Sequence, residues 1–454
     1  MSNGLNLSYY NFKLDRPTKK ELLIYNTRTG SIIKFEKEDY AIIKEIINNL
    51  NDIDENNVYL KTLKENGFIT AFDFDELKAV KNMYLAGSKR ENFISLTLLP
   101  AEHCNFACPY CFIYTYREKR MDKSTYDAIY NYIFDKVKDY KGEEQFTLRI
   151  NWFGGEPTLE IDNILKFSTR ILSLQEKFGL YYQSSMITNG YLMNYNNFEL
   201  LTNAGILHYQ FTFDGDQKFH NKVRYLKGKQ PTFDVIFNNI KYIKRYSNAN
   251  KDFRLDIRIN FLKPTVPSVY DLIDKLGEVI QQDVRFNIYC RPVYDFPTSR
   301  DTNELLSNDY MGREEGIRQQ MDFQFYIDKV LMKEKNEIRI SNPLPEPTIG
   351  WCSSEINNSF IIGADRSIFT CDTNIDDKFS IGQIDKDGQI QINENSEWRK
   401  PLYEMENVRV CLECRLLPIC QGGCRRVRLT DNALPCFWTD ELIQENMEKY
   451  LDTV

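Results

Sequence analysis

The spacing of eleven cysteines constrains the fold of this 454-residue chain more than any other feature of its sequence. Three of them lie close together, as Cys104, Cys108 and Cys111, while Cys290 stands alone and seven more follow from Cys352 onward. Because the first residues lack the positive and hydrophobic stretches of a signal peptide, we expect a cytoplasmic protein whose thiols stay reduced. Metal binding is then the leading explanation for the cysteines. Only three histidines are present, which disfavours mixed Cys/His zinc sites and favours iron–sulfur clusters.

Charge and hydropathy argue against two classes of partner. The net charge of -7 is spread along the chain without a basic block, which argues against nucleic acid. No run of about 18 apolar residues is present, so we expect no segment that spans a membrane. Small molecules or peptides are the expected substrates.

The pattern of residues 1–86 predicts a small β/α domain that carries no candidate catalytic or metal-binding residue. The segment LLIYNTRTGSIIKF, residues 22–35, predicts two strands joined by a turn at Gly30. Apolar residues at helical spacing predict two helices in residues 38–50 and 58–69.

Residues 87–300 predict a parallel sheet, because segments with strand patterns alternate with helical stretches. In such sheets the reactive groups gather in loops after the carboxyl ends of the strands. Residues 301–347 predict a helical connector. Residues 348–454 predict a loop-rich region with short strands, whose fold would depend on the clusters that it binds. The six predicted strands are residues 94–100, 146–153, 180–188, 209–214, 253–262 and 284–290.

The cysteine triplet follows the first of these strands in a C-x3-C-x2-C arrangement. Three thiolates this close can hold three irons of a [4Fe-4S] cluster and leave the fourth iron open for a cofactor or substrate. Three unrelated buried thiols, or a zinc site, are the alternatives.

The spacing of the triplet resembles that of the radical S-adenosylmethionine (radical SAM) superfamily. This resemblance implies that S-adenosylmethionine binds the open iron through its amino and carboxylate groups and yields a 5′-deoxyadenosyl radical that abstracts a substrate hydrogen. It also implies a partial (β/α)6 TIM-like barrel. Tyr110, directly before the third cysteine, matches the position that contacts the adenine.

Three further motifs resemble cofactor-binding segments of the same superfamily. Gly154, Gly155, Glu156 and Pro157 match a G-G-E-P motif that receives the cofactor's ammonium group, where glycines allow close approach and the carboxylate accepts a charged hydrogen bond. The segment TNG makes Thr188 and Asn189 candidate partners of the ribose. Ordinary turns are the alternative for both motifs. In FTFDGDQKFHNKVR, Thr212 and Arg224 match a further pattern, and Arg224 could pair with the cofactor carboxylate or be a surface arginine.

The C-terminal cysteines resemble the SPASM domain, the auxiliary-cluster extension of peptide-modifying radical SAM enzymes. The resemblance implies two more [4Fe-4S] clusters, three in all. Cys411, Cys414, Cys420 and Cys436 would hold one cluster fully, and Cys352, Cys371 and Cys424 would hold the other, with an iron left for Cys290 or substrate. Zinc, as in zinc ribbons, is the alternative.

Three residues near these cysteines carry separate expectations. Arg366 stands where the family usually has glycine, so we expect the local hairpin to turn differently. Cys290 ends the sixth strand and is either a catalytic or cluster-binding thiol near the barrel mouth or a small buried hydrophobe. Asp372 matches a proton-accepting aspartate of some family members, and a solvated loop aspartate is the alternative.

We therefore expect a SPASM-type peptide maturase that abstracts a hydrogen from a ribosomally made precursor peptide and forms a cross-link, most plausibly a cysteine thioether. The N-terminal domain is similar to small winged-helix-like domains that capture leader peptides by strand addition; a structural cap is the alternative. A reductant such as flavodoxin or ferredoxin is the further partner. Carbon–carbon or carbon–oxygen cross-linking, epimerisation, sulfatase maturation to formylglycine, and a non-catalytic metal-binding protein that recruits peptides remain alternatives.

Overall fold

The computed structural model describes residues 4–111, 113, 118–246, 252–281, 283–294, 308–331, 344–348, 352–430 and 434–453. The chain divides into two compact units, each built from separate stretches of sequence. Unit 1 comprises Met1–Lys89, Ile340–Ile356 and Lys400–Val454, and unit 2 comprises Arg90–Arg339 and Asn357–Arg399. Within the described ranges, no helix is long and apolar enough to cross a membrane. The division into four functional domains stays a prediction.

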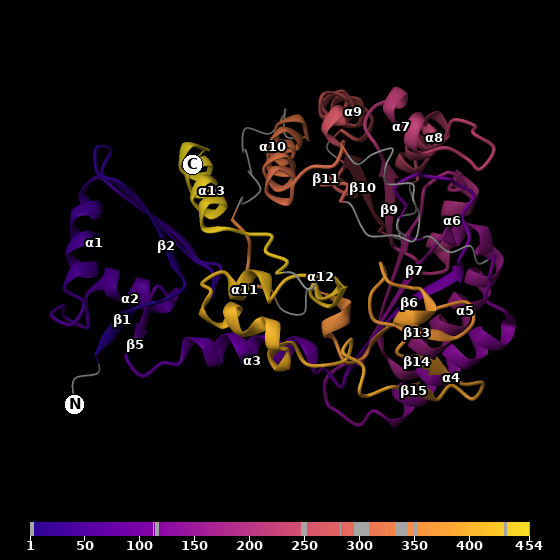
Figure 1. Ribbon diagram of the computed structural model, residues 1–454, viewed down its shortest axis with the longest axis horizontal. Coiled ribbons are helices and arrows are strands. Elements are labelled where there is room, and N and C mark those ends of the chain that lie inside the picture. The colour runs from indigo at the N-terminus through magenta and orange to yellow at the C-terminus, as the bar shows by residue number, and fades with distance from the viewer. Residues whose placement is uncertain are drawn as a thin grey trace. The chain divides into compact units, whose positions relative to one another are not determined.

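Unit 2 contains a sheet whose first six strands run parallel in the order β11-β10-β9-β8-β7-β6. This is the partial barrel of the predicted α/β fold, and each of the six predicted strands is confirmed. Figure 1 shows helices along one face of these strands. The strands are β6 (Phe93–Ala101), β7 (Thr147–Gly154), β8 (Tyr181–Ile187), β9 (His208–Phe213), β10 (Arg254–Phe261) and β11 (Phe286–Pro292).

The helices of unit 2 bury their apolar stripes against one face of the sheet. In the first of them, the Asp122 side chain caps the amino end by accepting from Thr125 N at 2.8 Å, and Ile129 and Ile133 enter the core at helical spacing. The main core of the molecule lies between these helices and the sheet. The helices are α4 (Lys123–Asp139), α5 (Ile161–Phe178), α6 (Tyr195–Asn203), α7 (Gln217–Val223), α8 (Phe233–Lys244) and α9 (Val266–Ile280).

The sheet continues beyond β6 with four short strands from the C-terminal third of the sequence. β12 (Ser359–Ile362) pairs in parallel with β6, and β13 (Ser367–Phe369), β14 (Gly382–Ile384) and β15 (Ile390–Ile392) follow in antiparallel order. This extension of the barrel sheet was not predicted. In the turn between β12 and β13, Arg366 adopts φ +70°, the left-handed region that glycine favours. The backbone therefore turns there as a glycine would allow, and the expected change of turn is not seen at this residue.

The connector predicted between the barrel and the C-terminal region contains one described helix, α10 (Arg313–Leu331), which packs against β11. Its amphipathic pattern buries Ile317, Phe323 and Ile327. The remaining residues of the predicted connector, 301–307 and 332–343, lie outside the described part of the chain.

Unit 1 is built on an antiparallel sheet of β2 (Asn11–Arg16), β3 (Glu21–Asn26) and β4 (Ile32–Glu36). The predicted hairpin is β3–β4, and the two predicted helices are α1 (Glu38–Asn48) and α2 (Val58–Glu65), so all three are confirmed. The sequence analysis missed β1 (Leu5–Leu7), which pairs with β5 (Ile69–Ala71), as well as β2 and α3 (Glu76–Ser88).

Both faces of the β2-β3-β4 sheet are covered. Leu22 and Ile24 of β3 pack with α1 and α2, while Leu23 and Tyr25 of the same strand face the C-terminal helix α13 (Asp440–Thr453). The period-2 alternation of β3 thus joins the N-terminal helices and the C-terminal segment to one sheet. The N-terminal elements and the C-terminal segment fold as one hydrophobic unit.

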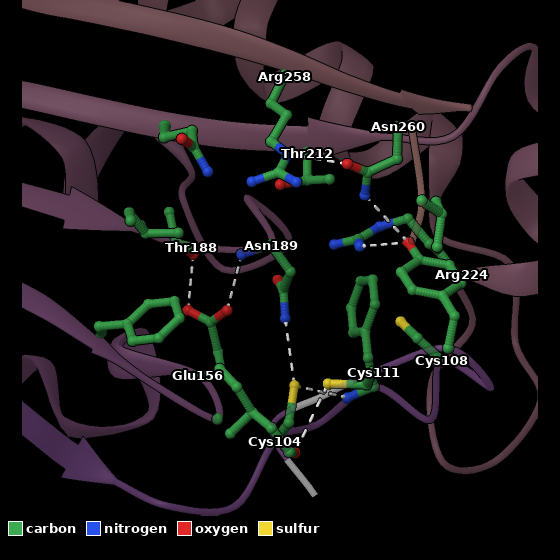
Figure 2. A pocket seen from close by; sticks show the side chains of 18 of the residues that line it. Cys104, Cys108, Cys111, Glu156, Thr188, Asn189, Thr212, Arg224, Arg258 and Asn260 are labelled. Atoms are coloured by element: carbon green, nitrogen blue, oxygen red, sulfur yellow. Dashed lines mark hydrogen bonds between the residues drawn. The ribbon is translucent and has the colours of Figure 1, made fainter. Parts of the chain in front are cut away.

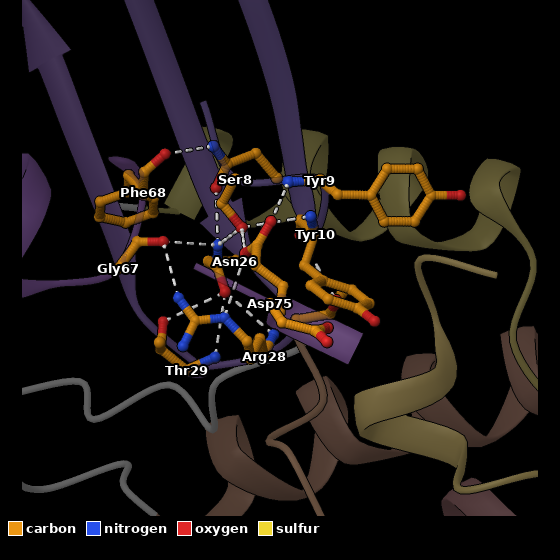
Figure 3. A network of polar contacts seen from close by, with 12 residues as sticks. Ser8, Tyr9, Tyr10, Asn26, Arg28, Thr29, Gly67, Phe68 and Asp75 are labelled. Atoms are coloured by element: carbon orange, nitrogen blue, oxygen red, sulfur yellow. Dashed lines mark hydrogen bonds and ion pairs between the residues drawn. The ribbon is translucent and has the colours of Figure 1, made fainter. Parts of the chain in front are cut away.

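A buried polar network fixes the turn of the N-terminal hairpin (Figure 3). The Asn26 side chain is fully buried; its Nδ2 donates to Ser8 Oγ at 2.9 Å and to Asn11 Oδ1 at 2.8 Å, and its Oδ1 accepts from the backbone N–H groups of Arg28 and Thr29 at 3.0 Å. A buried amide must satisfy its donors and acceptors, so this network specifies one conformation of the turn.

Candidate active site

A pocket opens among the carboxyl ends of the barrel strands in unit 2 (Figure 2). It brings together all the residues predicted for the first cluster and the cofactor, together with Asp372. These are Cys104, Cys108, Tyr110, Cys111, Gly154, Gly155, Glu156, Thr188, Asn189, Thr212 and Arg224.

The glycine pair after β7 lies directly against the start of the cysteine loop. A Cβ on Gly154, whose φ is +113°, would come within 2.4 Å of Ala101 O, and one on Gly155 within 2.3 Å of His103 O. The Gly155 and Glu156 N–H groups donate to the Ala101 and His103 carbonyls at 2.9 and 3.1 Å. The glycines therefore let the end of β7 hold the backbone that leads into Cys104.

Glu156 joins the ends of β7 and β8. Its side chain is buried, with Oε1 accepting from Thr188 Oγ1 at 2.6 Å and from Thr158 N at 3.0 Å, and Oε2 accepting from Asn189 N at 2.8 Å. Burial raises the pKa of Glu156, and these hydrogen bonds oppose that shift. Asn189 continues the chain of contacts, since its Nδ2 donates to Asn105 Oδ1 at 2.8 Å and lies 3.8 Å from Cys104 Sγ.

The thiols of Cys104 and Cys108 would lose their protons on binding a metal. Burial raises the pKa of Cys108 to about 12, against the opposing charge of Arg224, and raises the pKa of Cys104 further. The backbone N–H of Phe106 donates to Cys104 Sγ at 3.3 Å, which favours the thiolate. Iron binding would supply the positive charge that these buried thiolates need.

Arg224 lies on the opposite wall from Glu156. Its Nη1 donates to Tyr110 OH at 3.1 Å, and its Nε lies 3.9 Å from Asp214 Oδ1, beyond hydrogen-bond distance. Asn260 Nδ2 also reaches Tyr110 OH, at 3.3 Å. The buried Nε of Arg224 has no hydrogen-bond acceptor among the described residues. An unsatisfied donor on a buried guanidinium calls for an anionic acceptor from a ligand.

In the described part of the chain, no three Cys, His, Asp or Glu side chains surround a point where one metal ion could bind. A four-iron cluster takes one thiolate per iron at separate corners, and the triplet offers three thiolates on one loop.

Residues 98–258 match the Radical SAM superfamily. This chain contains a radical SAM domain. It is 26% identical to a cysteine-type anaerobic sulfatase-maturating enzyme of Clostridium novyi over 73% of this chain and 88% of that protein. It is 23% identical to a serine-type anaerobic sulfatase-maturating enzyme of Klebsiella aerogenes over 71% of this chain and 76% of that protein. The structure described as anSMEcpe with bound AdoMet shares the fold, with a TM-score of 0.54, 19% identity, and coverage of 79% of this chain and 93% of that one.

The pocket of the radical SAM domain fits S-adenosylmethionine and a [4Fe-4S] cluster. The triplet offers three thiolates on one loop, Arg224 offers an unsatisfied donor for a carboxylate, and Glu156 lies at the opposite wall for the ammonium group. Radical SAM domains bind both groups, so the domain at residues 98–258 makes this chain a radical SAM enzyme. The role of each lining residue stays a prediction.

The structure separates the two residues predicted to be catalytic. Asp372 lines the pocket, next to Thr373, whose Oγ1 lies 3.0 Å from Cys371 Sγ. Cys290 is instead buried in the core among Ile257, Ile259 and Ile288, and it does not line the pocket. Burial raises the pKa of its thiol. This placement matches the alternative of a small buried hydrophobe.

Six of the seven C-terminal cysteines belong to unit 1, and four of these lie together. Burial raises the pKa of Cys420 to about 12, and the neighbouring thiols of Cys411, Cys414 and Cys436 add to the shift. These four are the set predicted to hold one auxiliary cluster. Their ligation, the ligands of the other cluster and the number of clusters stay predictions.

Arginines and a glutamate hold the segments next to these cysteines. Three residues after Cys352, the buried Glu355 forms a two-point ion pair with Arg425, with Nε to Oε1 at 2.8 Å and Nη2 to Oε2 at 2.7 Å. Arg425 directly follows Cys424, so the pair fixes the two cysteine segments relative to each other. Tyr84 of α3 donates to the same carboxylate at 2.6 Å.

Several polar pocket residues were not predicted from the sequence, among them Gln210, Arg258, Asn260 and Arg291. The signal for them was present in the alternation of the strands. In β10, Arg258 and Asn260 alternate with Ile257 and Ile259, which enter the core. Polar residues on the face away from the helices must point into the barrel.

Proposed function

We propose that this enzyme modifies a cysteine-bearing precursor peptide by radical chemistry and forms a thioether cross-link. The observation that carries the proposal is that Asp372 lines the same pocket as the triplet and the cofactor-binding residues. A thioether forms when the peptide loses one hydrogen atom from carbon, one proton from the thiol and one electron. When bound, S-adenosylmethionine and the clusters supply the hydrogen-abstracting radical and take up that electron.

The chain's own residues divide the remaining work. Glu156 and Arg224 orient the cofactor from opposite walls, and Asn189 keeps the cysteine loop against the end of β8. Asp372 accepts the proton of the substrate thiol through its carboxylate. Leu99 and Phe153, which pack with the β12–β13 extension, keep this wall of the barrel apolar.

Sulfatase maturation is the second candidate, and the comparisons favour it. The curated relatives described above are named as anaerobic sulfatase-maturating enzymes, and this chain covers most of their length. Formylglycine formation from cysteine would use the same pocket and the same base. The products differ, because a thioether retains the cysteine sulfur and formylglycine loses it.

For the peptide's leader, we propose strand addition at the edge strand β4 of unit 1. The described sheet has three strands in the order β2-β3-β4, so β4 offers an edge. Flavodoxin or ferredoxin would supply the electron for cofactor cleavage, and the two auxiliary clusters would accompany the first.

The deciding experiment is mass spectrometry of a cysteine-bearing peptide encoded beside this gene. The peptide is incubated anaerobically with reconstituted enzyme, reductant and S-adenosylmethionine. A product that lacks two hydrogens, keeps its sulfur and no longer reacts with a thiol reagent is expected, and the Asp372→Asn variant should form it far more slowly. Loss of sulfur would select the second candidate. Formation of 5′-deoxyadenosine while the peptide stays unchanged would reject both.

A further inference from the structure

Two arginines on neighbouring strands line the pocket beyond the residues assigned to the cofactor. Arg258 of β10 pairs in register with Tyr289 of β11, and Asn260 of β10 pairs with Arg291. Both arginines stand on the face away from the helices, and both line the pocket. Figure 2 shows the Arg258 guanidinium beside Thr212, on the side of the pocket away from the cysteines. Arg291 is exposed at the mouth.

Neutral side chains accept hydrogen bonds from both guanidinium groups. Arg258 Nε donates to Asn260 Oδ1 at 2.8 Å, and Arg291 Nη1 donates to Gln320 Oε1 of α10 at 2.9 Å. Neither arginine has an ion pair within the described ranges. The strand register makes Arg258 and Arg291 diagonal neighbours on β10 and β11, and both line the same pocket.

Two buried carboxylates near the cofactor-binding residues, Glu156 and Asp214, already have partners. Glu156 already accepts from Thr158, Thr188 and Asn189. Asp214 Oδ1 lies 3.9 Å from Arg224 Nε and accepts from Asn260 Nδ2 at 3.4 Å. S-adenosylmethionine has a single carboxylate, for which Arg224 holds an unsatisfied donor, and its other two charges are positive. Glu156, Asp214 and the cofactor carboxylate are therefore each matched to groups other than this pair of arginines.

Two like charges side by side in a half-buried pocket are unfavourable until an anion joins them. Arg258 also forms a hydrogen bond with the side chain of its strand neighbour Tyr289. After these bonds to neutral groups, each guanidinium still has donors for a ligand. Planar guanidinium donors of this kind match the two oxygens of a carboxylate.

We propose that Arg258 and Arg291 form a carboxylate subsite that selects substrate peptides with an Asp or Glu side chain close to the modified residue. This inference rests on the proposed function, because it requires a peptide in the pocket. The carboxylate anchors the peptide on the β10–β11 side of the pocket. Asp372 and Thr373 follow β13, which lies beyond the other end of the six parallel strands. The anchor thereby fixes which peptide residue meets the cofactor.

The test is a peptide library with one fixed cysteine and randomised flanks, prepared with amidated and with free C-termini. Reconstituted enzyme, reductant and S-adenosylmethionine are added, and modified peptides are identified by mass spectrometry. At one flanking position, Asp and Glu should be enriched about tenfold over Asn and Gln in both preparations. Arg258→Gln and Arg291→Gln should lose this enrichment, while Arg291→Glu should shift it to Lys and Arg.

Arg254→Gln is the matched control, because Arg254 lies on the same strand with its own partner, Asp256, at 2.9 Å and does not line the pocket. It should keep the enrichment. Equal modification of acidic and amide peptides overturns the subsite, and so does loss of S-adenosylmethionine binding in Arg258→Gln, which would assign the arginine to the cofactor. Enrichment confined to free C-termini overturns the side-chain assignment. Cofactor cleavage with no modified peptide rejects the proposed function itself. If the Arg258→Gln variant fails to fold, the Arg291→Glu variant tests the subsite instead, because Arg291 is exposed.

Discussion

The guanidinium of Arg428 donates a hydrogen bond from Nη2 to the sulfur of Cys411 at 3.3 Å. Arg428 lies in α12 (Arg425–Thr430), and its Nε and Nη1 hold the carbonyls of Gly422 and Asn407 at 2.5 and 3.1 Å. The charged donor is thus fixed by backbone contacts in the orientation that reaches the sulfur. Donors of this kind stabilise a thiolate and, in a bound cluster, the reduced form.

Replacing Arg428 with glutamine should make the reduction potential of one auxiliary cluster more negative, because the extra electron loses a nearby positive donor. Potentiometric titration followed by electron paramagnetic resonance measures the shift. Arg428→Lys, which keeps the charge, should shift the potential less. The exposed Arg409 provides the control, and Arg409→Gln should leave the spectrum as it is. An Arg428→Gln potential equal to that of the native enzyme would contradict the assignment of Cys411 as a cluster ligand.

Replacing Cys104, Cys108 and Cys111 together with alanine should remove one cluster and stop cofactor cleavage. The native reconstituted enzyme should carry about 12 irons per chain and the variant about 8, at four irons per cluster. Iron analysis and chromatography of 5′-deoxyadenosine measure both effects. Cys290→Ala should retain the native iron content, because Cys290 is buried in the core and does not line the pocket. Retained cofactor cleavage in the triple variant would refute the role of the triplet.

The barrel strands were predictable because each is long, apolar on one face and followed by a helix, so that local pattern and final fold agree. β12 to β15 were not, since three or four residues carry too little periodicity, and the partner of β12 is β6, more than 250 residues earlier in the chain. The pocket residues that lie in sequence motifs were predicted. Arg258 and Arg291 were missed because the alternation along β10 and β11, which separates core-facing residues from those that face into the barrel, was not used.

The side-chain direction of Cys290 also shows why alternation matters. Its place at the end of the sixth strand was predicted correctly, but the direction of its side chain depends on the alternation with Tyr289 and Arg291. Reading that alternation places Cys290 with Ile288 against the helices. The last residue of a strand lines the mouth of a barrel only when its side chain points to the inner face of the sheet.

Lys34→Pro should weaken binding of the leader peptide without disturbing unit 1. The bonds from Asn26 N to Ser31 O and from Lys37 N to Lys20 O mark the ends of the β3–β4 ladder. Alternation between these ends turns the N–H of Lys34 away from β3, toward the open edge. Proline there removes a donor needed for strand addition and leaves the hairpin bonds in place.

Fluorescence anisotropy with a labelled precursor peptide measures the effect of Lys34→Pro, and Lys34→Ala is its control for the lost charge. Equal affinities of Lys34→Pro and Lys34→Ala would contradict strand addition at β4. Deleting residues 1–86 is a poorer test, because Leu23 and Tyr25 pack against Ile443 and Met447 of α13. The deletion should expose that core and lower the melting temperature of the whole of unit 1.

The stability of unit 2 should fall as the pH drops below about 6.5, where free histidine gains a proton. His220 is fully buried; its Nδ1 accepts from Asp214 N at 3.3 Å, and its Nε2 lies 3.0 Å from Thr232 Oγ1, which donates to Arg224 O at 2.7 Å. Burial first, and then the charge of Arg224, hold the pKa of His220 well below its usual value. Above about 6.5 both folded and unfolded chains carry a neutral imidazole.

Below that pH only the unfolded chain takes up the proton, so the free energy of unfolding falls by about 1.4 kcal/mol per pH unit until the folded pKa is reached. His103, whose pKa is lowered by burial and then by Arg120, adds in the same direction. Thermal unfolding between pH 5 and 8 measures the slope. His220→Gln should flatten it by about one proton. A slope unchanged in His220→Gln would show that proton uptake by this buried imidazole does not cause the loss of stability.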